Sequence, residues 1–178
     1  MEISVGFLST RQHAELGYFG GLLILNALAR PLEFQCTLPV KPTRAQELLY
    51  GPTLHDFVCG EQIAQALSVK CKLKPDWIFT DTPAVLGMTH VSKTNVVLVS
   101  SKEPPQASEL ILPVSRIQLR RLHVRDRELG VDLSVPVARD EPDVDSLLAA
   151  IDANFDLAEP FQRIVEALLE AHPAVRAA

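Results

Sequence analysis

The sequence predicts one mixed α/β domain whose strands and helices form layers. Short apolar runs rich in β-branched residues indicate strands, and stretches with apolar residues every three or four positions indicate amphipathic helices. These elements occur as strands, two helices, further strands and two final helices over residues 1–178. Because they come in groups and do not alternate strictly, the order favours an α+β-like layered single domain over a doubly wound sheet.

Composition limits the class of protein. The chain has 178 residues, of which 47% are hydrophobic and 22% charged, enough to bury one sizeable core. The longest uncharged apolar run, residues 17–29, is too short to span a membrane, and the acidic start lacks the basic residues of a signal peptide. Three widely spaced cysteines indicate reduced thiols. We therefore predict a cytoplasmic location and no membrane span.

The N-terminal part predicts a β-hairpin. Residues 2–8 alternate apolar and polar side chains, which is typical of a strand. The pattern of residues 9–19 does not decide between a short helical turn and an early start of the next strand. Residues 20–26 are continuously apolar, as in a strand covered on both faces. The short turn 27–31 joins them to an alternating strand at 32–40.

Two consecutive helices should follow the hairpin. Thr43 and Gln46 have the spacing of a capping box, which predicts a helix over 44–50 that ends at the Gly-Pro pair behind it. Thr53 is expected to cap the second helix. Gly60 lies inside that helix and should weaken it by about 1 kcal/mol relative to alanine.

The second half predicts more strands and then two helices. Four β-rich runs occur at residues 76–81, 95–101, 109–117 and 131–137. The linker between the first two is shorter than an ordinary crossover, so parallel pairing is possible but tight. Amphipathic helices are expected at 143–155 and 159–172.

The alternating strand 32–40 raises the question of a catalytic face. Glu33 and Gln35 project from the same side of it. Metal-dependent nucleases of the PD-(D/E)xK type use a glutamate and a lysine in this relation, with a divalent metal on the carboxylate. Here glutamine takes the second position, and Glu15 would have to supply the preceding acid. The alternative is a strand whose polar side simply meets solvent.

Two aspartates bracket the strand 76–81. Ligands gather beyond the carboxyl ends of strands in open α/β sheets, so Asp81 and Thr82 could line a crevice with Ser100 and Ser101. Asp76 or Asp81 could hold a metal ion there. The alternative is that Asp81 and Thr82 cap a helix.

Cys59 is the best candidate nucleophile. It lies four residues after His55 in the same predicted helix, so the two side chains share a face. An imidazolium can stabilise a thiolate in such a pair. The alternative is a buried structural thiol.

An arginine-rich segment is the densest charged feature. Arg116, Arg120, Arg121 and Arg125 could bind a phosphate, a nucleotide or RNA, because the guanidinium fork matches phosphate oxygens. The alternative is a solvated or salt-bridged surface.

These observations leave two functions open. The main prediction is a non-catalytic adaptor or complex subunit that acts through a protein partner or self-association and needs no cofactor, because no nucleophile, base and orienting group are visible together. The alternative is a metal-dependent enzyme, a nuclease or phosphate-ester hydrolase, with a divalent metal at Glu15, Glu33 and Gln35 or at Asp76 and Asp81. The net charge of −5 disfavours extensive nucleic-acid binding, although it leaves it possible.

Overall fold

The protein is built around one mixed β-sheet. The computed structural model describes residues 4–101, 117–122, 130–137, 143–149, 151–152 and 154–176. Its strands are β1 (Ser4–His13), β2 (Gly17–Asn26), β3 (Pro31–Cys36), β4 (Trp77–Thr80), β5 (Asn95–Ser101), β6 (Leu119–Leu122) and β7 (Val131–Pro136). Their order in the sheet is β3-β2-β1-β4-β5-β7-β6. Strands β1, β4 and β5 run parallel, and every other neighbouring pair is antiparallel.

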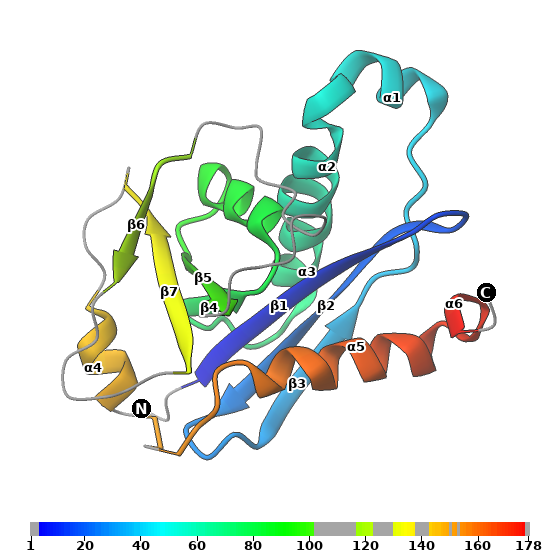
Figure 1. Cartoon of the computed structure of the whole chain (residues 1–178). Coiled ribbons are helices and arrows are strands. Elements are labelled where there is room, and N and C mark those ends of the chain that lie inside the picture. Colours follow the sequence, from blue (N-terminus) through cyan, green and yellow to red (C-terminus); the bar gives the residue numbers. More distant parts are fainter. Residues whose placement is uncertain are drawn as a thin grey trace.

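Helices cover both faces of this sheet (Figure 1). They are α1 (Arg44–Tyr50), η1 (Gly51–Thr53), α2 (Leu54–Asp56), η2 (Phe57–Ile63), α3 (Ala64–Lys70), η3 (Pro83–His90), α4 (Val144–Ala149), α5 (Glu159–Ala171) and α6 (Pro173–Arg176). Apolar residues of η2, α3 and η3 pack on one face, and those of α4 and α5 pack on the other. The predicted mixed α/β class is confirmed. In the described ranges, no helix is long and apolar enough to cross a membrane.

The central strand β1 is buried on both sides. Phe7 stacks on Phe79 of β4 with ring centroids 5.4 Å apart, and its ring also contacts Phe155 and Phe161 from the C-terminal region. Leu8 points to the opposite face and joins the core under α3. The apolar side of the predicted C-terminal helix 159–172 therefore completes the main core.

The hairpin region is longer than the sequence predicted. Strand β1 continues to His13, so the undecided residues 9–19 form the ends of two strands joined by a tight turn. Gly17 leaves this turn with a φ of 89°, where a Cβ would lie 2.2 Å from the carbonyl oxygen of Val40. Only glycine fits that backbone and that space. The predicted hairpin is confirmed, with β2 and β3 paired antiparallel, although β3 ends at Cys36 and not at position 40.

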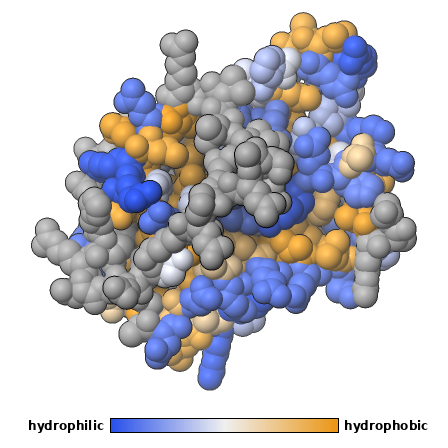
Figure 2. All heavy atoms as spheres, in the orientation of Figure 1, coloured by the Kyte–Doolittle hydropathy of each residue, from blue (hydrophilic) through white to orange (hydrophobic). Residues whose placement is uncertain are grey.

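Helix α1 forms as predicted and stands away from the sheet (Figure 1). Thr43 and Gln46 make the reciprocal capping box, and Gly51 ends the helix. None of its residues is buried, and Leu48 and Leu49 are 66% and 84% exposed. Figure 2 shows hydrophobic residues beside hydrophilic ones over α1, at the top of the view.

The second helix runs without interruption from α2 through the π-helical η2 to α3. Thr53 does not cap it with its side chain, because its hydroxyl donates to the carbonyl of Tyr50. Gly60 has a packing role that helix propensity does not reveal. A Cβ at this position would lie 2.3 Å from the carbonyl oxygen of Ala84 in η3. The glycine therefore allows η2 and η3 to pack backbone against backbone.

Strands β4 and β5 do pair in parallel, and the 3-10 helix η3 accounts for the shortness of the connection between them. Ile78 pairs with Val96 in parallel register. The connection contains a 3-10 helix, which rises about 2.0 Å per residue against 1.5 Å for an α-helix. A short linker therefore spans the crossover. Strand β7 confirms the run at 131–137, whereas the run predicted at 109–117 lies outside the described residues up to position 116.

Candidate functional site

Polar side chains converge where the parallel pairing of β1 with β4 ends. Leu8, in the middle of β1, pairs with Thr80, the last residue of β4. We call the five residues just beyond this pair the strand-end cluster: Ser9, Thr10, Arg11, Asp81 and Thr82. The first three belong to β1, and the last two follow β4. Carboxyl ends of parallel strands are the usual place for ligands in open α/β sheets.

Three of these side chains form a closed hydrogen-bonded ring. The hydroxyl of Ser9 donates to Oδ1 of Asp81 at 2.7 Å. Arg11 donates from Nη2 to Oδ2 of Asp81 at 2.8 Å and from Nη1 to the Ser9 hydroxyl at 2.6 Å. Thr82 adds a bond to Oδ1 at 3.0 Å and accepts the amide of Thr10 at 3.2 Å. Each of these side chains is therefore held in one orientation.

The two charged members of the cluster reach solvent. The side chains of Arg11 and Asp81 are 38% and 24% exposed, whereas Ser9 is fully buried. Arg11 also donates from Nη1 to the carbonyl of Thr10 at 2.8 Å. Among the described residues, its Nε–H and one Nη2–H have no hydrogen-bond partner. An arginine fixed in this way can receive an anion.

The sequence predicted two of the five residues of this cluster. Asp81 and Thr82 do lie at the end of β4 as predicted, and Thr82 is the N-cap residue of η3, although its side chain makes no cap hydrogen bond. Ser100 lies near the carboxyl end of β5, two residues beyond Leu98, which pairs with Thr80. Ser9 and Arg11 were missed because residues 9–19 were not recognised as strand. Continuing the alternation of residues 2–8 through position 11 would have placed them on the face of Phe7.

Glu33 and Gln35 have a structural role. Both carboxylate oxygens of Glu33 accept the backbone amide of Lys72 at 3.0 Å, and one accepts that of Leu73 at 2.9 Å. Gln35 donates to the same carboxylate at 3.1 Å. These bonds, that of Leu73 first, lower the pKa of Glu33. The polar face of β3 therefore fixes the turn behind α3, and the Glu33 carboxylate already accepts hydrogen bonds from Lys72, Leu73 and Gln35.

The four acids predicted to bind a metal are not brought together. Glu15 lies in the turn between β1 and β2, and Glu33 pairs with Ile24 near the other end of β2. Asp76 precedes β4 and Asp81 follows it, so they lie at opposite ends of that strand. Within the described ranges, no group of three or more His, Cys, Asp or Glu side chains could hold a metal ion.

Cys59 is a core thiol. It is a buried residue of η2, and this burial is the main cause that raises its pKa to about 11. The nearby carboxylate of Asp56 raises this pKa further, while a hydrogen bond with Thr10 acts against both. Burial also lowers the pKa of His55. A protonated thiol beside a neutral imidazole is not an activated nucleophile, so the structure favours the buried structural thiol.

Cys59 should make the protein less stable at alkaline pH. The unfolded thiol ionises near pH 9, whereas the folded thiol keeps its proton to about pH 11. Stability from this group is therefore complete below pH 9 and is lost as the pH rises to 11, by about 2 to 3 kcal/mol in all. Urea unfolding between about pH 8 and about pH 11 measures this loss. Cys59→Ala should lessen the pH dependence, and an equally steep loss in that variant would contradict the assignment.

The arginine-rich segment is extended where it is described. Arg120 and Arg121 belong to β6, at the edge of the sheet opposite β3. Arg121 pairs with Asp132 of β7 at 3.2 Å. Arg116 and Arg125 lie outside the described residues. The ion pair of Arg121 agrees with a salt-bridged surface, and an anion site in this segment stays a prediction.

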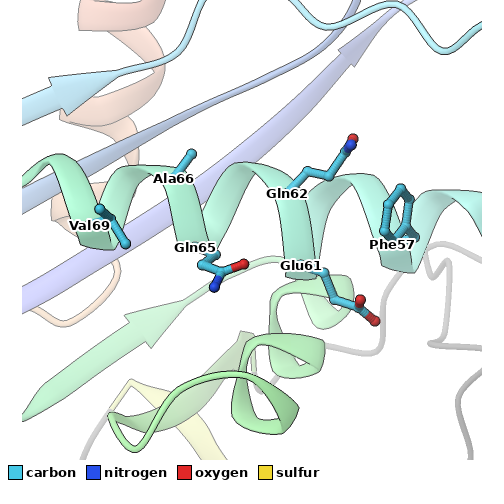
Figure 3. Close-up of a pocket in the computed structure, with 6 residues that line it drawn as sticks. All are labelled: Phe57, Glu61, Gln62, Gln65, Ala66 and Val69. Carbon is cyan, nitrogen blue, oxygen red and sulfur yellow. The ribbon is translucent and has the colours of Figure 1, made fainter.

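A shallow depression of about 450 Å³ lies on the helix formed by η2 and α3 (Figure 3). It is lined by Phe57, Glu61, Gln62, Gln65, Ala66 and Val69. Figure 3 shows Glu61 and Gln65 pointing to one side of the helix and Gln62 and Ala66 to the other. All six residues come from this one helix, so the depression lacks a facing wall of polar groups and is separate from the strand-end cluster.

Comparison with known proteins relates the fold to nucleases. No family model matches the sequence, and no curated protein matches it significantly. Human endonuclease V (ENDOV) shares the fold, with a TM-score of 0.52 and 15% identity over 99% of this chain and 87% of that chain. A crystal structure of Ciona intestinalis endonuclease V with a 23mer DNA containing an inosine followed by a ribo-adenosine has a TM-score of 0.44 and 13% identity, over 76% of this chain and 70% of that one.

The shared fold contradicts the prediction of a non-catalytic adaptor or complex subunit. That prediction depended on the lack of a legible motif in the sequence, and the match over 99% of the chain is with the fold of a nuclease. Neither the fold nor the comparisons support the predicted protein partner. The chain has the fold of human ENDOV.

Proposed function

We propose that this protein is a nuclease that binds a nucleic acid strand at the strand-end cluster and hydrolyses a phosphodiester bond there. The observation that carries the proposal is the fold shared with human ENDOV over 99% of the chain. The paired cation and acid just beyond the end of the parallel β1–β4 pairing support it, because the carboxyl ends of parallel strands are where such a sheet offers a ligand site.

Arg11 and Asp81 have complementary roles in the proposed reaction. The partly exposed guanidinium of Arg11 would contact the phosphate and stabilise the negative charge that develops on its oxygens. Asp81 would hold the guanidinium through Oδ2, which keeps one lone pair free to accept a proton from the attacking water. Ser9 and Thr82 would orient the carboxylate through Oδ1.

A resident divalent metal does not fit the described residues. Asp81 is the single acid in the strand-end cluster, and three side chains, one of them a cation, already donate to it. A metal ion would have to displace Arg11 from Oδ2, and Glu15, Glu33 and Asp76 are too far along their strands to help. We therefore derive no step of the reaction through a metal.

Binding and cleavage can be tested with end-labelled oligonucleotides. Single-stranded DNA, duplex DNA, RNA and a strand with one inosine serve as probes, binding is read by fluorescence anisotropy and cleavage by denaturing gel. We expect saturable binding to at least one probe and a product of defined length. If the folded protein neither binds nor cleaves any of them, the proposed function is wrong.

Two variants assign the activity to the cluster. Arg11→Ala should weaken binding about tenfold and reduce the salt dependence of log Kd by about 0.7 to 0.9, the value for one lost phosphate contact. Asp81→Asn should abolish cleavage and retain binding. Arg163→Ala is the matched control, because Arg163 is 33% exposed and also pairs with a carboxylate, that of Glu159 in α5. Equal losses in the control and in Arg11→Ala would remove the cluster from the site.

The predicted cytoplasmic location remains part of the proposal. The cysteines at positions 36, 59 and 71 are all free thiols, as expected in a reducing compartment. Nucleic acids are present there as substrates.

A further inference from the structure

We infer that the Arg11 guanidinium takes the place of a divalent metal at this site, so that the protein binds the phosphate of its nucleic acid without a metal ion. The inference rests on the proposed function and specifies how its site recognises the substrate. It follows because the strand-end cluster offers one carboxylate that is already bonded to a guanidinium, and a divalent metal requires oxygen ligands that face the ion.

The geometry of Arg11 leaves it prepared for a phosphate. Its two Nη1 hydrogens are taken by Ser9 and by the carbonyl of Thr10, and one Nη2 hydrogen is taken by Asp81. These three bonds fix the plane of the guanidinium. No described residue accepts the Nε–H or the second Nη2–H, so these two donors are available to an anion. The side chain is 38% exposed. Two donors of one rigid group can bind two oxygens of a phosphate.

The same bonds make Asp81 a poor metal ligand. Mg²⁺ and Mn²⁺ sites use one or two carboxylates together with water and substrate phosphate, and those carboxylates must face the ion. Here Oδ2 faces a guanidinium at 2.8 Å, and Oδ1 accepts from two hydroxyls. Among the described residues, a divalent ion next to Arg11 would meet like charge, with the single carboxylate of Asp81 to offset it. The cluster therefore carries its own fixed cation.

The first test uses Mn²⁺ alone, without nucleic acid. The electron paramagnetic resonance signal of free Mn²⁺ disappears when the ion binds to protein. We expect the unmodified protein and Asp81→Asn to take up Mn²⁺ equally, whether or not surface acids bind some of it. One Mn²⁺ per chain that Asp81→Asn fails to bind would overturn the inference.

The second test measures oligonucleotide affinity in EDTA and in Mg²⁺ at matched ionic strength. We expect affinities within about twofold of each other, and a tenfold loss on Arg11→Ala in both buffers. Arg11→Lys keeps the charge without the fork and should recover only part of that loss. Binding that needs Mg²⁺, or full recovery by lysine, would overturn the inference.

The two tests separate this inference from the proposed function. If no oligonucleotide binds in either buffer, the proposed function fails, and the Mn²⁺ titration still reports whether Asp81 holds a metal. If oligonucleotides bind only with Mg²⁺, the nuclease proposal stands and the inference about Arg11 fails. Thermal unfolding of each variant confirms that it is folded under the assay conditions.

Discussion

Gly60→Ala should destabilise the protein by about 3 kcal/mol, although alanine favours helices. In isolation the substitution would add about 1 kcal/mol of helix propensity. In the fold, the new Cβ would lie 2.3 Å from the carbonyl oxygen of Ala84, which belongs to backbone that cannot swing aside. Helices η2 and η3 would have to separate. Urea unfolding of the purified variant measures the loss.

Gly87→Ala is the matched control for this prediction. Gly87 lies on the facing helix η3, is buried, and its nearest neighbours, including Gly60, would be 3.8 Å from an added Cβ. That is an ordinary van der Waals contact, so the change should be close to neutral. If Gly60→Ala were as stable as Gly87→Ala, the two helices could not be packed as closely as the structure has them.

Leu168→Asp should unfold the protein or lower its stability by several kcal/mol. Leu168 is 1% exposed and belongs to the main core under α5, together with Phe161 and Ile164. An aspartate there would be a buried charge with no partner, which costs more than the lost apolar contacts. Circular dichroism with size-exclusion chromatography would show the loss of native structure.

Ala171→Asp tests whether that loss depends on the buried face. Ala171 is the last residue of α5 and is exposed, so the same carboxylate would meet water. Its expected cost is only about 0.5 kcal/mol, from the negative end of the helix dipole. A comparable loss in the two variants would contradict the orientation of α5 on the sheet.

Local sequence patterns predicted the elements whose cause is local. The capping box of Thr43 and Gln46 and the Gly51 stop define α1 within one residue, because their bonds involve only neighbouring backbone. The continuous apolar run 20–26 similarly predicted the doubly covered β2. Strand β1 was predicted too short because its last residues are polar. Their extended form depends on pairing with β2, which no local pattern encodes.

The site was harder to predict for the same reason. Arg11 and Asp81 are 70 positions apart in the chain and meet only because β1 and β4 are parallel neighbours. Glu33 illustrates the opposite error. It has the residue type and spacing of a metal ligand, yet the amides of Lys72 and Leu73 reach it from the turn behind α3. Residue type alone cannot distinguish a carboxylate that binds a ligand from one that holds a loop.

The stacking of Phe7 between β4 and the C-terminal region also determines when the protein can fold. Phe7 is made first during synthesis, and its partners Phe155 and Phe161 are made near the end. The face of the central strand that carries Phe7, Ser9 and Arg11 therefore stays uncovered by α5 until more than 150 further residues have been synthesised. Contacts this distant in sequence slow folding. We expect the core around Phe7 to be completed only after α5 has been synthesised.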